Sequence, residues 1–186
     1  NCGSTRLNNQ EMRNCVYSGA FNDLLNELNG DKNWMGINHL QHPTDYRYTK
    51  QEIILRSFAF LDRYQSYAGR LSLFLNDYMA DNRNPSPEFL AEKRKLFQRI
   101  AAIVNKLVFP PPMPQQYNIS QMEATMTGVA FNLDYLSQRT DNEIQKMFKK
   151  LLKDGKFSDD KLVEDLSGKE RVIARIETAK RIFGGK

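Results

Sequence analysis

The residues best suited to chemistry lie near the start of the chain, where Glu11, Arg13 and Asn14 fall within four positions. The planar guanidinium of Arg13 presents a fork of donors that suits a phosphate or a carboxylate. A structural role is the alternative, in which Arg13 takes part in a buried ion pair or a hydrogen-bond bracket, with Glu11 as a candidate partner. Asn1 and Asn14 are expected to hold the surrounding loop rather than to touch a ligand directly.

A second group of cations lies near the end of the chain. From Lys169 onward there are six basic and two acidic residues, and the basic set includes Arg171, Arg175 and Arg181. A helix with such a face can neutralise phosphates and bind nucleic acid with an affinity that depends on salt rather than on base sequence. The alternative is that these cations offset the dipole at the C-terminal end of a helix.

Other residue types that carry chemistry are sparse. The chain has two histidines, His39 and His42, and neither a zinc-ribbon spacing nor a phosphate-binding loop accompanies them. We interpret the pair as loop residues and assign no catalytic residue and no metal site. Cys2 and Cys15 are predicted to be free thiols in a reducing cytoplasm, with a disulfide between them as the alternative.

The composition is that of a soluble globular protein, with 40% hydrophobic and 26% charged residues. A chain of 186 residues is long enough for one domain with a sizeable core. No apolar run approaches the roughly 18 residues that a membrane span needs, so no membrane contact is predicted. The net charge of +5 permits contact with nucleic acid without establishing it.

Local signals place the polar run near the N-terminus on a short helix. Asn8 is a suitable N-cap, and Glu11 three residues later completes a capping box. Leu7 and Met12 occupy the two positions of a hydrophobic staple. This helix is expected to end at residues 17–19.

The rest of the chain is expected to be a succession of amphipathic helices. One covers residues 21–29, and a broad apolar face makes residues 49–68 the expected central helix, with Arg56, Asp62 and Arg63 on its solvated edge. Four more capping boxes are predicted, at Thr49 with Glu52, Ser120 with Glu123, Thr140 with Glu143, and Ser167 with Glu170.

Ser86 and Pro87 predict the start of another helix, which runs to about Val108. The prolines of residues 110–114 end it and predict a rigid connector, with a polyproline ligand for another protein as the alternative. The helix also carries a basic cluster, interpreted as a solvent face with phosphate contact as the alternative, that consists of Lys93, Arg94, Lys95 and Arg99.

The opening stretch resembles the ParB/sulfiredoxin-like N-terminal domain of GmrSD-type (type IV) restriction endonucleases. That family carries a run of the form N-x-G-x-x-x-L-x-x-x-E-(I/L/M)-R-N, followed by a short apolar stretch and a glycine. The continuation over residues 21–28 and the basic segment at 167–183 are also similar. The run is matched by Asn1, Gly3, Leu7, Glu11, Met12, Arg13, Asn14 and Gly19.

Two departures from the family pattern shape the prediction. Arg6 stands where the family usually has proline, and the family's Asp-Gly-x-Gln-Arg motif does not occur in the sequence. We therefore interpret the chain as the C-terminal part of a longer protein. The predicted fold is mainly α, a bundle of about seven to nine helices over residues 20–186, with residues 1–19 as a possible remnant of a ParB-like α/β half.

The resemblance implies a defence protein whose ParB-like half handles nucleotide, with nucleotide and Mg²⁺ as candidate cofactors, while a fused or partner nuclease cuts modified DNA. The present chain is expected to be inactive alone and to supply a wall of the nucleotide or DNA site and a basic surface. The alternative is a non-enzymatic helical module that docks another protein. The candidate binding residues are Asn1, Glu11, Arg13, Asn14, Arg171, Arg175 and Arg181.

Overall fold

The structure is a computed structural model that describes residues 6–37, 48–108, 118–157 and 166–186. All regular structure in these ranges is helical, which confirms the predicted mainly α fold. Short helices such as α3 and α8 bring the number of α-helices in the described ranges above the predicted seven to nine. The elements are α1 (Asn9–Val16), α2 (Ala20–Asn29), α3 (Lys32–Gly36), α4 (Thr49–Arg63), η1 (Tyr64–Ser66), α5 (Leu71–Asp81), α6 (Pro87–Val108), α7 (Ile119–Phe131), α8 (Leu133–Leu136), α9 (Asp141–Leu152), η2 (Gly155–Phe157) and α10 (Lys169–Phe183).

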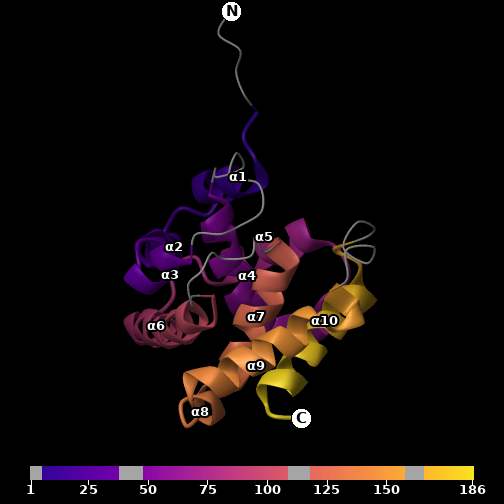
Figure 1. The fold of residues 1–186 in the computed structure, drawn as a ribbon. Coiled ribbons are helices and arrows are strands. Elements are labelled where there is room, and N and C mark those ends of the chain that lie inside the picture. The colour runs from indigo at the N-terminus through magenta and orange to yellow at the C-terminus, as the bar shows by residue number, and fades with distance from the viewer. Residues whose placement is uncertain (1–5, 38–47, 109–117, 158–165) are drawn as a thin grey trace, which may run out of the picture.

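The bundle is built around α4, which contacts α1, α2, α5 and α7 as the predicted central helix should (Figure 1). Helices α2, α3 and α6 pack together on one side of it. On the other side α10 lies along α7 and α9. Helix α1 and the C-terminal residue lie at opposite ends of the molecule (Figure 1).

The apolar core consists of a large cluster and a small one. The large cluster draws on most helices, from Phe21 in α2 to Phe183 in α10. Leu71 and Phe74 of α5 pack against both clusters and so join them. The small cluster consists of Phe60, Tyr64, Tyr67, Val172 and Ile176.

Two of the predicted capping boxes are confirmed. At α1, the Glu11 backbone N–H donates to Asn8 Oδ1 at 2.9 Å, and the Asn8 N–H donates to Glu11 Oε2 at 2.8 Å. At α9, Thr140 and Glu143 form the same reciprocal pair of bonds. Each box supplies partners to backbone groups that a helix end leaves unpaired.

The other three boxes, at α4, α7 and α10, are not formed as predicted. Helix α7 is capped by Asn118 and Gln121. In the described ranges, the N-cap residues of α4 and α10 are Tyr48 and Gly168, and neither makes a side-chain capping bond. Glu52 and Glu123, the acids expected to complete two of these boxes, pair with arginines instead. Ion pairs inside the bundle therefore take the place of the local capping bonds that these two glutamates were expected to make.

The basic cluster of α6 is not one solvent face. Lys93 is only 8% exposed, and its Nζ donates to Asp62 Oδ1 and Oδ2 at 2.8 and 2.6 Å. Arg94 and Arg99 are partly exposed but also paired with acids of neighbouring helices. Much of this positive charge is therefore neutralised within the chain.

None of the described helices combines the length and the apolar composition that a membrane span requires.

Some sequence predictions concern segments outside the described residues. The predictions outside the described ranges are those for Asn1, Cys2, Gly3, His39 and His42 and for the proline connector of residues 110–114.

Candidate functional site

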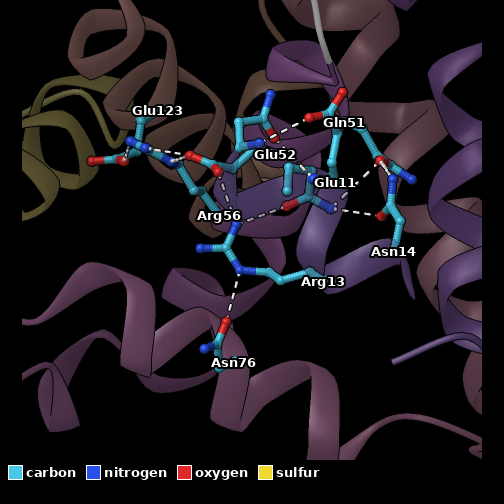
Figure 2. A network of polar contacts seen from close by, with 10 residues as sticks. Glu11, Arg13, Asn14, Gln51, Glu52, Arg56, Asn76 and Glu123 are labelled. Atoms are coloured by element: carbon cyan, nitrogen blue, oxygen red, sulfur yellow. Dashed lines mark hydrogen bonds and ion pairs between the residues drawn. The ribbon is translucent and has the colours of Figure 1, made fainter. Parts of the chain in front are cut away.

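Arg13 lies in the interior, with 2% of its surface exposed. Its Nη1 donates to Glu52 Oε2 at 2.8 Å and to Gln10 Oε1 at 2.9 Å, and its Nε donates to Asn76 Oδ1 at 3.0 Å. One guanidinium thus joins α1, α4 and α5 (Figure 2). Arg13 takes part in a buried ion pair, and its acid is Glu52 rather than Glu11.

The other described candidates near the N-terminus also have structural partners. The carboxylate of Glu11 closes the capping box of α1. Asn14 Nδ2 donates to Gln51 Oε1 at 2.8 Å, and Gln51 Nε2 donates to Asn26 Oδ1 at 2.8 Å. Gln51 is fully buried, so this polar network holds α1 against α4 and α2 (Figure 2).

The ion pair of Arg13 continues as a row of alternating charges. Glu52 Oε1 accepts from Arg56 Nε at 3.0 Å, and Arg56 Nη1 donates to Glu123 Oε2 at 3.0 Å. The row Arg13, Glu52, Arg56 and Glu123 runs from α1 across α4 to α7 (Figure 2). The prediction that Arg56 lies on the solvated edge of α4 is wrong, because its side chain is only 15% exposed.

The charges of this row stabilise one another against burial. Burial alone would raise the pKa of Glu52, but the charges of Arg56 and Arg13 outweigh it and hold that pKa below its ordinary value. Burial likewise disfavours the charge on Arg56, yet Glu123 and Glu52 raise the pKa of its guanidinium. Glu52 and Arg56 are therefore both ionised at neutral pH.

The outward face of α1 is apolar. Leu7, Met12 and Val16 are 55%, 46% and 60% exposed, so the predicted staple leaves both of its members largely in solvent. Cys15, on the same helix, is a free and exposed thiol. Helix α1 therefore turns its polar side chains inward and its apolar side chains outward, which reverses the usual arrangement.

Two adjoining pockets lie beside the row of charges. The larger, of about 470 Å³, is lined by Arg13, Glu52, Arg56 and the start of α5. The smaller, of about 160 Å³, is lined by Arg56, Glu123, Arg175 and apolar side chains. Arg56, Leu71 and Ser167 line both pockets, which therefore share a wall.

The three arginine candidates of α10 have different surroundings. Arg175 is 3% exposed, its Nη2 donates to Leu166 O at 2.5 Å, and its Nε has no hydrogen-bond partner in the part of the chain that the structure describes. Burial lowers the pKa of its guanidinium. Arg171 is half-buried, whereas Arg181 is exposed and lies 3.9 Å from Asp154. Arg175 therefore does not lie on the basic surface expected from the sequence.

No family model matches the chain, and neither a curated protein nor a solved structure matches it significantly. The resemblance to GmrSD-type endonucleases therefore stays a prediction that rests on the N-terminal motif. In the described ranges, no group of three or more His, Cys, Asp or Glu side chains is placed to hold a metal ion.

Sequence reasoning missed Glu52, Arg56 and Glu123 as members of the site. A signal for the first two was present, because an acid and a base four residues apart lie on the same face of a helix. Nothing in the local sequence pairs Arg56 with Glu123, which lies 67 residues away. The assembly of this site depends on long-range packing.

Proposed function

We propose that the chain is the helical part of a GmrSD-like, nucleotide-dependent DNA restriction or defence protein, and that α1 joins it to a nucleotide-handling layer. The observation that supports this proposal is the reversed orientation of α1. The proposal also rests on the sequence resemblance, which places this stretch at the end of a ParB-like half. In this role the chain supplies a wall of the nucleotide or DNA site rather than the catalytic groups.

The exposed face of α1 is suited to contact with another protein layer. Apolar side chains scattered singly on a surface need no explanation, but Met12, Cys15 and Val16 are spaced to share one face of a helix. Each is exposed, and Leu7 extends the surface at the start of the helix. Covering this face would remove apolar surface from water, which favours association.

The buried side of α1 explains why the helix keeps this orientation. Turning its apolar face inward would pull Arg13 away from Glu52 and Asn76 and would leave buried polar groups unpaired. A lone buried charge is costly, so the network fixes α1 with its apolar face outward. We therefore assign Arg13 a positioning role, and its contact with a ligand is not needed for the proposed function.

The proposal can be tested with the ParB-like half of a GmrSD-type endonuclease, produced as a separate chain and titrated against this protein by calorimetry. We expect the two chains to bind. The double substitution Met12→Lys and Val16→Lys should abolish this binding, because both lysine charges would have to be buried in the interface. Met35→Lys is the matched control, since Met35 is 51% exposed on α3. Unchanged binding by the α1 variant would refute the proposal.

A non-enzymatic docking module is the second candidate function. It is favoured by the pairing of surface cations with acids, as in Arg94 with Glu27 and Arg99 with Asp134. Duplex DNA binding measured against salt concentration separates the two candidates. The defence role predicts an affinity that falls steeply with salt, whereas a docking module predicts little binding at any salt.

A further inference from the structure

We propose that the two adjoining pockets around Arg56 form a binding site for a small organic phosphate. The phosphate group occupies the larger pocket, against Arg70 and the start of α5, and the organic part occupies the smaller pocket beside Arg175. This site is separate from the exposed face of α1, and the proposal does not depend on the docking of α1.

The charge of the pocket walls favours an anion. Four arginines line the two pockets against two glutamates, which leaves an excess of two positive charges. A phosphate monoester carries a charge of about −1.5 to −2 at neutral pH and matches this excess. The arginines are Arg13, Arg56, Arg70 and Arg175, and the glutamates are Glu52 and Glu123.

The start of α5 supplies further donors. No side chain caps this helix, whose first turn begins at Leu71 after Arg70. The first N–H groups of a helix lack partners within the helix and carry partial positive charge, so phosphates bind there readily. Leu71, Ser72 and Leu73 all line the larger pocket, and the Ser72 hydroxyl is an additional donor.

Arg175 provides an independent indication of a ligand. A guanidinium that is 97% buried normally has all of its donors paired, but among the described residues Nε of Arg175 has no partner, and the side chain lines the smaller pocket. Burial lowers the pKa of Arg175, and the attraction of Glu123 does not offset this effect. Nε itself is closed off from the pocket, so a ligand would act on Arg175 through its charge, as an anion in the adjoining pocket that offsets the cost of burying the guanidinium.

The dimensions and walls of the pockets define the class of ligand. Pockets of about 300–1,000 Å³ are typical for small molecules, and the larger pocket alone has about 470 Å³. Leu71, Ile119 and Val172 give the smaller pocket an apolar wall suited to the organic part of the ligand. A duplex is too bulky to reach Arg175, so the class is a small phosphate ester rather than DNA.

Calorimetry of the whole chain at low ionic strength tests the site. The probes are inorganic phosphate, the four common nucleoside monophosphates and glucose 6-phosphate. At least one ester is expected to bind once per chain, at least tenfold more tightly than inorganic phosphate, because inorganic phosphate leaves the smaller pocket empty. Failure of every probe to bind at millimolar concentration would overturn the proposal, as would equal affinity for inorganic phosphate and all esters.

Two substitutions separate the roles of the pockets. Arg70→Gln is expected to lower the affinity for inorganic phosphate and for the ester alike by about tenfold. Because Arg70 is exposed, this substitution should not change the fold. Arg175→Met removes one of the two excess charges and is expected to weaken binding of the ester more than binding of inorganic phosphate, while thermal unfolding checks that the variant is folded. Arg99→Gln, on α6, is the control and should bind as the wild type does. Ester affinity that neither Arg70→Gln nor Arg175→Met reduces contradicts the site.

Discussion

Arg13 makes its three hydrogen bonds to residues of three helices, Gln10 of α1, Glu52 of α4 and Asn76 of α5. Arg13→Met keeps the approximate length of the side chain but removes the charge and all three donors. We expect the free energy of unfolding to fall by about 3 kcal/mol, because breaking a buried ion pair from one side is strongly destabilising. Urea denaturation at neutral pH measures this loss.

A surface pair provides the comparison for that measurement. Arg99 and Asp134 are 45% and 93% exposed, and their ion pair spans α6 and α8. Pairs of this kind contribute at most about 1 kcal/mol, so Arg99→Gln should change the unfolding free energy little. Equal losses in the Arg13 and Arg99 variants would contradict the structural role assigned to Arg13.

The lowered pKa of Glu52 predicts how stability depends on pH. Its pKa lies below 4.5 in the folded chain, despite burial, because of Arg56 and Arg13. The ionised carboxylate therefore stabilises the fold fully above the ordinary pKa, and this contribution is lost as the pH falls through the folded pKa. The stability difference between wild type and Glu52→Gln should accordingly shrink from about pH 5 to pH 3. Unfolding curves over that range measure the difference, and a constant difference would refute this account.

At the scale of single residues, the sequence predicted types of interaction better than partners. Arg13 stood out because a guanidinium suits anions, but its acid lies 39 residues away and no local pattern identifies it. Gly19 fits the family motif, and the structure gives it a packing role as well. A Cβ there would lie 2.6 Å from Asn84 Oδ1 and 2.8 Å from the Arg83 carbonyl oxygen.

At the scale of elements, the contact between α7 and α10 depends on Gly128. A Cβ on Gly128 would lie 2.7 Å from Ala179 Cβ and 2.8 Å from Phe183 Cδ2. Gly128→Ala should gain helix propensity but lose more through overpacking, with a net decrease in unfolding free energy of about 2 kcal/mol. Thermal or urea unfolding measures it.

Gly155, at the start of η2, is the matched control for that substitution. Among the described residues, a Cβ at Gly155 meets nothing within 4 Å, so Gly155→Ala should leave stability within about 0.5 kcal/mol of the wild type or raise it slightly. A Gly128→Ala variant as stable as the Gly155→Ala variant would show that the two helices can separate without cost.

Helix positions were the part of the fold most accessible from the sequence. Apolar periodicity and the N-caps Asn8 and Thr140 act locally, so α1, α2 and α6 were predicted within a residue or two, as was the start of α9. The misplaced caps involve Glu52 and Glu123, which bind Arg56 instead. A capping box and an interior ion pair use the same residue types, and only packing decides between them.

At the scale of the whole molecule, the two apolar clusters are expected to unfold together. Leu71 and Phe74 pack against both, and α10 contributes residues to each. The single tryptophan, Trp34, is 1% exposed in the large cluster and packs edge-on against Phe97. Its fluorescence and the far-UV circular dichroism should therefore follow one urea transition. Fluorescence that changes before the helical signal would show that the clusters unfold separately.

The row of charges also connects the exposed helix to the pockets. Glu52 gives one oxygen to Arg13 on α1 and the other to Arg56, which lines both pockets. Docking on α1 and phosphate binding beside Arg56 would thus act on one shared carboxylate. If either event changes the affinity of the other, thermodynamic reciprocity requires both affinities to change by the same factor. The Glu52 carboxylate would then be the group that couples the binding of a partner protein to the binding of a small phosphate ester.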